Sequence, residues 1–289
     1  MLPLPPPAYA IASAFVFLTG LCIGSFLNVC IWRIPRDESI AWPGSHCPAC
    51  NHPLSVLDNI PLLSWLFLRG RCRYCKAPIT PRYFLVELLT GLLFFLLWWT
   101  RGITWTTPVY ILYACALVVG AFIDIEHLIL PDRITLGGMV AGLVLSPLWP
   151  PLQGETARLP AFCSSLAGLV LGYGLLWLVA VLGRAALKRE AMGMGDWKLL
   201  GAIGACLGWK AVLFTVLVSS LTGTLTGFAF ILLGRKEWQS RIPYGPHLSL
   251  AAILWLLCGP ELLSLYLSWA HKLITDNGGE IVYQEDWGL

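Results

Sequence analysis

Residues 160–183 read PAFCSSLAGLVLGYGLLWLVAVLG and contain no charged side chain. A helix needs about 20 mostly apolar residues to cross a bilayer, so this stretch predicts a membrane span. The composition agrees, because 57% of the 289 residues are hydrophobic and 12% are charged. Soluble domains carry about 25% charged residues. We therefore predict an all-α polytopic membrane protein.

The intervals between charged residues predict about eight spans. No Lys or Arg precedes the first apolar stretch, which favours a retained helix over a cleaved signal peptide. The sixth and seventh spans are separated only by Gly208, Trp209 and Lys210, which is typical of a tight turn between two helices. The spans are expected at residues 8–32, 84–100, 104–124, 134–150, 160–183, 195–209, 211–234 and 244–270.

Basic residues are concentrated on one side of this predicted topology. The loops 33–83, 125–133, 184–198 and 235–241 hold 15 of the 19 Lys and Arg residues. The positive-inside rule assigns these loops to the cytoplasm. The loop 33–83 is then the only sizeable domain that we expect outside the membrane.

Four of the ten cysteines form two pairs inside that loop. Cys47 and Cys50 lie in HCPAC, and Cys72 and Cys75 lie in RCRYC. Two C-x2-C pairs with a 21-residue spacer are typical of a tetrahedral structural zinc site. A redox pair or two disulfides are the alternatives, but stable disulfides are rare in a reducing compartment. We expect Zn²⁺ to hold the fold of this loop.

Two carboxylates lie at the edges of predicted spans. Asp124 ends the third span, and Asp196 begins the sixth. Because successive spans alternate in direction, both carboxylates are expected at the cytoplasmic edge of the bilayer. Two adjacent carboxylates do not both ionise cheaply and share one proton at neutral pH, as an aspartic protease requires.

Each carboxylate also has a structural interpretation. Asp124 could contact Arg133 at a helix end, and Asp196 could favour the positive end of its helix dipole. Asp132 is read as a loop carboxylate, and Lys198 as a local counter-ion or a phospholipid contact.

The glycines before Asp196, in MGMGDWKLL, weigh against a purely structural role. Gly193 and Gly195 each lower helix stability by roughly 1 kcal/mol relative to Ala. They also allow a bent backbone and the close approach of another chain. We expect them to give an extended substrate room beside Asp196.

These segments together resemble the type IV prepilin peptidases, membrane aspartic proteases of the GxGD type. In chain order the resemblance rests on the following segments: GSFLNVCIWRIP, the two cysteine pairs, DNIPLLSW, RYFLVELLTG, FIDIEHLILPD, GMGDWKLL and IPYGPHLSLA. It implies that Asp124 and Asp196 are the catalytic pair. It places Asp132 at the Asp/Asn position that follows the proline.

The resemblance also implies an activity, substrates and a methyl donor. Such enzymes cut a basic leader from prepilins or pseudopilins after a Gly, at the cytoplasmic face of the bacterial inner membrane. Members with the cysteine loop then methylate the new N-terminus with S-adenosylmethionine. No G-x-G-x-x-G fingerprint places that cofactor, and Gly24, Ser25, Asn28, Asp58 and Asn59 are candidates for its contacts.

The chain is accordingly divided into four parts. These are a first transmembrane helix at 1–32, a zinc-binding, methyltransferase-associated loop domain at 33–83, a peptidase helix bundle at 84–271 and a polar tail at 272–289. Prepilins and membrane lipids are the expected partners. Nucleic acid is excluded, because the net charge is only +3 and basic residues do not alternate with aromatic ones. A proton-coupled transporter and a scaffold without chemistry are the rival functions.

Overall fold

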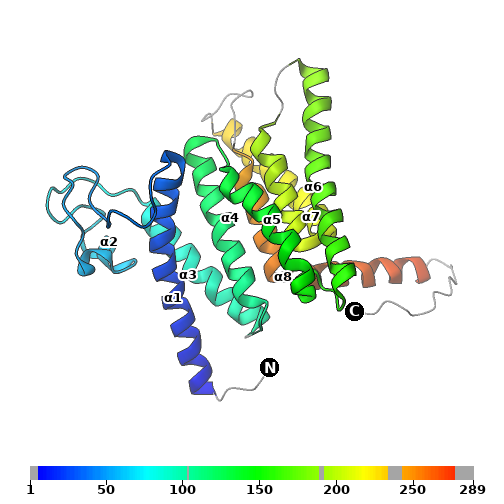
Figure 1. The fold of residues 1–289 in the computed structure, drawn as a ribbon, viewed down its shortest axis with the longest axis horizontal. Helices are drawn as coiled ribbons and strands as arrows, with labels where there is room; N and C mark the ends of the chain where they lie inside the picture. Colours follow the sequence, from blue (N-terminus) through cyan, green and yellow to red (C-terminus); the bar gives the residue numbers. More distant parts are fainter. Residues whose placement is uncertain (1–5, 103, 189–191, 234–242, 277–289) are drawn as a thin grey trace.

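The fold is a bundle of long helices with a small loop module at its side (Figure 1). The computed structural model describes residues 6–102, 104–188, 192–233 and 243–276. Within them there is no β-strand, and only isolated bridges join extended residues. The helices are α1 (Pro6–Arg33), α2 (Leu63–Phe67), α3 (Arg82–Arg101), α4 (Thr107–His127), α5 (Asp132–Leu148), α6 (Arg158–Leu187), α7 (Met194–Leu232) and α8 (Gly245–Asp276).

The long helices account for the predicted number of membrane passes. Six of them, α1, α3, α4, α6, α7 and α8, are long and apolar enough to cross a membrane. The α5 helix is shorter, with 17 residues, but covers the predicted fourth span. The α7 helix contains two passes, because its backbone leaves helical geometry at Gly208. The prediction of an all-α polytopic protein with about eight spans is confirmed.

The bend at Gly208 is completed by the connection between α5 and α6. Gly208 has a φ of 83°, which L side chains rarely adopt, and an added Cβ would lie 2.7 Å from Oε1 of Gln153. Gln153 ends the 3-10 turn Pro150–Gln153 and donates from Nε2 to the carbonyls of Ala205 and Cys206, at 3.0 and 3.2 Å. This long connection therefore supplies donors to carbonyls that the bend releases.

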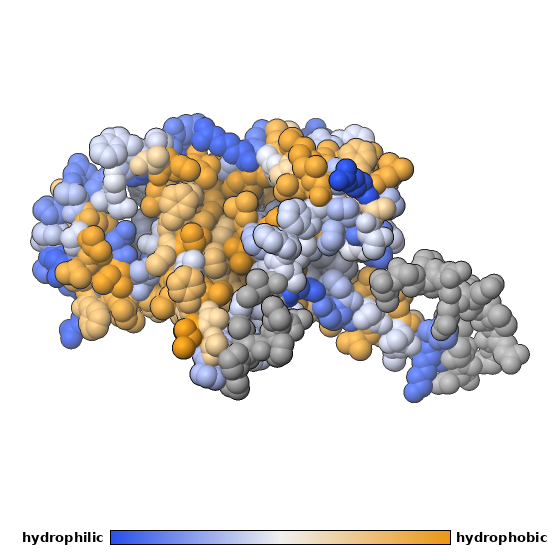
Figure 2. Space-filling view, turned by 60° about the horizontal axis from the view of Figure 1, so that its bottom comes forward, coloured by the Kyte–Doolittle hydropathy of each residue, from blue (hydrophilic) through white to orange (hydrophobic). Residues whose placement is uncertain are grey.

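Two apolar cores hold the bundle together. One joins α1, α3 and α4 and includes Ile31, Val86 and Ile123, each with no exposed surface. The other is centred on α7 and α8 and includes Leu200 and Leu248, which are also fully buried. Hydrophobic side chains also cover much of the flank of the bundle (Figure 2). An apolar flank is what a bilayer-spanning bundle requires.

The loop module leaves α1 and returns at α3, and we call this end of the bundle the loop end. Arg33, the last residue of α1, is buried and donates to the carbonyls of Ser39 and Pro43 at 2.8 and 2.7 Å. Its guanidinium thus ties the start of the loop back to the helix. Arg82, the first residue of α3, pairs with Glu126 of α4 at 2.6 Å. The loop end is therefore held together by these hydrogen bonds and by an ion pair between α3 and α4.

The predicted last span, 244–270, is bent. The α8 helix contains Pro260, and beyond it the chain turns away from the bundle at the far end, opposite the loop (Figure 1). The helix continues to Asp276, so the first residues of the predicted polar tail 272–289 are helical, and residues 277–289 lie outside the described part.

Candidate active site

Asp124 lies in the last turn of α4, at the loop end. Its side chain is buried, with 6% of the residue exposed. The backbone N–H of Gly245, at the start of α8, donates to its Oδ2 at 3.0 Å. The alternative contact with Arg133 is not formed, because Arg133 pairs with Asp37 at 3.1 Å. The structure therefore leaves Asp124 a neutral backbone donor and no partner cation among the ion pairs of the described residues.

Asp196 lies in the first turn of α7, also at the loop end, and 9% of the residue is exposed. Its carboxylate is close enough to Asp124 for the two charges to interact. The backbone N–H of Asp196 donates to the carbonyl of Gly193 at 3.3 Å. A carboxylate in the first turn also benefits from the helix dipole, as the structural interpretation held. The two buried carboxylates come from helices far apart in sequence and lie at the same end of the bundle, where Leu130 is close to both Gly195 and Gly245.

The glycines before Asp196 have different surroundings. At Gly193 an added Cβ would meet only Oδ2 of Asp196, at 3.5 Å. At Gly195 it would lie 2.8 Å from Cβ of Leu130, in the segment between α4 and α5. Gly195 therefore makes room for Leu130 of the same chain, where the sequence led us to expect an approaching substrate.

The remaining predicted polar residues form an ion pair beside the site. Lys198 of α7 donates from Nζ to Oδ1 of Asp132 at 2.7 Å. Asp132 is the first residue of α5, so the pair joins the loop ends of α5 and α7. Both side chains are partly exposed. Lys198 is thus a counter-ion of Asp132. Asp132 begins a helix rather than lying in a loop, and its ion pair does not include Asp124 or Asp196.

Sequence reasoning missed a polar cluster between α7 and α8. The hydroxyls of Ser219 and Tyr244 lie 2.7 Å apart, and Nδ1 of His247 lies 3.2 Å from Oγ1 of Thr222. Polar side chains inside an apolar bundle are costly unless they are paired, and these residues pair with one another. Tyr244 and His247 flank Gly245 in the segment IPYGPHLSLA, whereas Ser219 and Thr222 lie in α7.

An apolar groove of about 260 Å³ runs between α4 and α5, with residues of α7 at its floor. Arg133 lines it near the loop end, and Leu152 and Gln153 line it near the far end. On α5, its wall is formed by small residues, namely Gly137, Gly138, Ala141 and Gly142. The groove is therefore apolar over its length and has a cation near the end at which Asp124 and Asp196 meet.

The four loop cysteines meet in one cluster. The Sγ atoms of Cys47, Cys50, Cys72 and Cys75 all lie within 4.8 Å of one another, and Cys47 and Cys75 are 3.8 Å apart. A tetrahedral zinc site with Zn–S distances of about 2.3 Å separates its sulfurs by about 3.8 Å. The cluster could therefore hold a zinc ion.

Both cysteine pairs are built as the same turn. The carbonyls of Cys47 and Cys72 accept from the N–H groups of Asn51 and Lys76, at 2.8 and 3.1 Å. Asn51 and Lys76 both have positive φ, at 55° and 60°. Backbone hydrogen bonds at Cys75 and Tyr74 lower the pKa of the Cys72 thiol to about 7. The turn of the second pair thus favours the thiolate of Cys72, which is the form that binds metal.

The loop also docks on α3 through a buried carboxylate. Oε2 of Glu87 accepts from the N–H of Leu62 at 2.8 Å, at the start of the short helix α2. Gly24 of α1 packs against the same residue, because an added Cβ would lie 2.7 Å from Cα of Glu87. The first helix, the loop and α3 therefore meet at Glu87.

Residues considered for the methyl donor fall into two groups. Gly24 and Asn28 lie at this junction, where Nδ2 of Asn28 donates to the carbonyl of Tyr83 at 3.1 Å and its buried Oδ1 has no partner. Asp58 instead pairs with Arg73 at 2.5 Å and caps its own turn through Ser55. Asp58 is therefore explained by loop structure, whereas Asn28 keeps an unused acceptor.

These features define a multi-pass membrane protein with two buried carboxylates at one end and a four-thiol cluster in its loop module. Residues 18–101 match the bacterial peptidase A24 N-terminal domain, and residues 111–228 match the type IV leader peptidase family. No solved structure matches the chain.

Several curated proteins named prepilin leader peptidase/N-methyltransferase are similar to the chain over most of its length. The protein of Aeromonas hydrophila is 40% identical over 279 residues, which cover 88% of this chain and 93% of that one. The protein of Myxococcus xanthus is 44% identical over 227 residues (78% and 64%), and that of Pseudomonas aeruginosa is 36% identical over 283 residues (89% and 95%). The chain belongs to the type IV leader peptidase family.

Proposed function

We propose that the chain cleaves the basic leader from type IV prepilins or pseudopilins and then methylates the new N-terminus. The observation that carries the proposal is that Asp124 and Asp196 are both buried at the loop end of a family member, close enough for their charges to interact. One carboxylate takes a proton from the attacking water, and the other donates a proton to the carbonyl oxygen of the scissile peptide. The peptide C–N bond then breaks, and the released amine takes up a proton.

The surroundings of the pair support a substrate that enters from the loop side. The concentration of Lys and Arg in the loops supports a location of this face on the cytoplasmic side of a bacterial inner membrane. The apolar groove along α5 offers space for the hydrophobic segment that follows a leader. A transporter would instead require carboxylates near the middle of the bilayer, with access from both sides.

The loop module supports the methyl-transfer step. Four thiolates fill the coordination shell of zinc, so the metal would hold the loop rather than activate water. S-adenosylmethionine would supply the methyl group, and we place its site where the loop meets α1 and α3. Asn28 and Glu87 are two buried polar side chains at that junction, and Oδ1 of Asn28 is an acceptor without a partner.

The test is a two-step assay with the full-length protein in detergent. A prepilin with its leader is incubated with and without S-adenosylmethionine, and the products are read by mass spectrometry. We expect cleavage after the leader Gly in both reactions, and a product heavier by one methyl group only with the donor. A prepilin that stays intact would contradict the peptidase assignment, and a cleaved but unmethylated product would contradict the second activity alone.

A further inference from the structure

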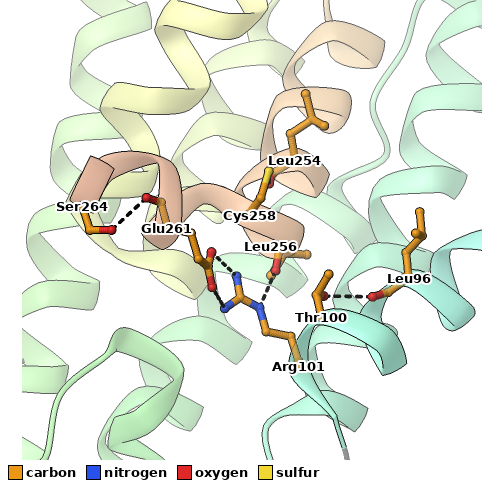
Figure 3. A network of polar contacts seen from close by, with 8 residues as sticks. All are labelled: Leu96, Thr100, Arg101, Leu254, Leu256, Cys258, Glu261 and Ser264. Atoms are coloured by element: carbon orange, nitrogen blue, oxygen red, sulfur yellow. Dashed lines mark hydrogen bonds and ion pairs between the residues drawn. The ribbon is translucent and has the colours of Figure 1, made fainter. Parts of the chain in front are cut away.

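The last part of α8 turns away from the bundle at Pro260, and specific contacts hold this bend. Proline has no N–H, so the carbonyl of Leu256, four residues earlier, loses its helical donor. Nε of Arg101, at the end of α3, donates to that carbonyl at 2.9 Å (Figure 3). Its two terminal nitrogens donate to the carboxylate of Glu261, at 2.8 and 3.3 Å. The bend is therefore a clamped feature at the far end of the bundle.

The residues beyond the bend have two chemically different faces. At 100° per residue, the polar side chains of 261–272 fall on one stripe and the apolar ones on the other faces. The apolar side chains are largely exposed, with 64% of Leu265 and 59% of Trp269 accessible. The polar stripe consists of Glu261, Ser264, Ser268, His271 and Lys272.

The position of this segment distinguishes an interfacial helix from a membrane span. It starts beside Arg101, where α3 ends, and runs outward from the bundle in Figure 1. A span would be apolar on every face exposed to lipid, whereas a helix in the plane of the interface has one polar and one apolar face. Leu263, on the apolar side, packs against the core of α7 and α8, so that side faces the bundle interior at the bend.

The geometry points to residues 261–272 as an interfacial helix that binds the lipid headgroup region of the leaflet at the far end. Its apolar face rests on the acyl chains, and its polar stripe faces water. The segment is about 18 Å long at 1.5 Å per residue. The same α8 begins at Gly245, which bonds to Asp124, so this lipid contact fixes the depth of a helix that reaches the candidate active site. The inference goes beyond the proposed function and does not depend on it.

The test measures exposure to water residue by residue. The full-length protein is placed in nanodiscs of phosphatidylethanolamine and phosphatidylglycerol, and single cysteines are introduced at 262, 264, 265, 268 and 269. Their reaction rates with a charged maleimide are measured above the background of the native cysteines. We expect S264C and S268C to react roughly ten-fold faster than L265C and W269C, because burial in lipid suppresses the thiolate. Equal rates at all positions would overturn the proposal.

A second measurement tells whether lipid or a second copy of the chain covers the apolar face. Bimane attached at L265C should be quenched by lipids brominated on their acyl chains, and bimane at S264C should be quenched less. Absence of quenching at position 265, together with disulfide formation between two L265C chains, would show that protein covers the face and would overturn the proposal. In a chain with a cysteine at position 262, the double substitution L265E and W269E should increase the reaction rate of that cysteine with maleimide. The matched double substitution S264E and S268E should leave the rate unchanged.

Discussion

The backbone N–H of Gly245 donates a 3.0 Å hydrogen bond to Oδ2 of Asp124, across 121 positions of sequence. The start of α8 therefore sets the position of a buried carboxylate at the end of α4. An added Cβ at Gly245 would lie 2.7 Å from that oxygen and 3.3 Å from Cδ1 of Leu130. Nothing larger than glycine fits there unless the carboxylate moves.

We expect Gly245→Ala to lower kcat by roughly 100-fold, because a misplacement of about 1 Å in a catalytic group can cost that much. KM for the prepilin should change little, since the leader contacts are left in place. The matched control is Gly174→Ala on α6, where an added Cβ meets nothing within 4 Å. Cleavage rates of the two variants, measured with the same prepilin, check the prediction. It fails if both retain wild-type kcat.

The sequence revealed the spans but not this contact. Charged residues bound the spans, and two local C-x2-C turns form the four-thiol cluster, so short segments of sequence predict both. The bond from Gly245 to Asp124 involves a backbone donor from a distant helix, which leaves no local pattern. Gly195 is a similar case. The sequence indicates that this position requires a small residue, but it does not indicate that Leu130 fills the space beside it.

The ion pair between Lys198 and Asp132 should matter far less than the buried carboxylates. Both partners are partly exposed, and such pairs contribute about 0.2–1 kcal/mol. We expect Lys198→Ala and Asp132→Asn each to keep cleavage within about five-fold of wild type. The double variant should lose no more than either single one. A loss of about 100-fold in Asp132→Asn would place that carboxylate in the chemistry instead.

The cysteine cluster should separate the two proposed activities. Cys47→Ser and Cys72→Ser remove a zinc ligand, so we expect zinc content and methylation to fall while cleavage persists. Cys258→Ser is the matched control, because this thiol lies in α8 away from the cluster and donates to the carbonyl of Leu254. Metal analysis and the two product masses are the readouts. Zinc content at the wild-type level in Cys47→Ser would contradict the metal site.

The stability of the loop module should depend on pH through Asp58. Hydrogen bonds from Arg73, and then from Ser55, hold the pKa of this carboxyl below its usual range. A carboxyl whose pKa is depressed in the folded state stabilises the fold when the pH is above its unfolded pKa of about 3.9. That stabilisation is lost as the pH falls through the pKa of the folded state. We expect Asp58→Asn to speed limited proteolysis of the loop at pH 7.

That difference from wild type should shrink below about pH 4, where the unfolded and then the folded carboxyl become protonated. Arg73→Ala should reproduce the effect of Asp58→Asn at pH 7, because it removes the same ion pair. A difference that stays constant from pH 7 to the acid limit would show that the carboxyl charge is not what stabilises the loop.

The most direct test of the catalytic pair compares Asp124→Asn, Asp196→Asn and Asp132→Asn with wild type in the prepilin cleavage assay. Asparagine keeps the shape of aspartate but cannot accept or donate the proton, which lowers rates by about 10²–10⁴-fold. We predict that the first two variants lose cleavage while remaining folded, and that Asp132→Asn keeps it. Cleavage at a near wild-type rate by either Asp124→Asn or Asp196→Asn would contradict the account.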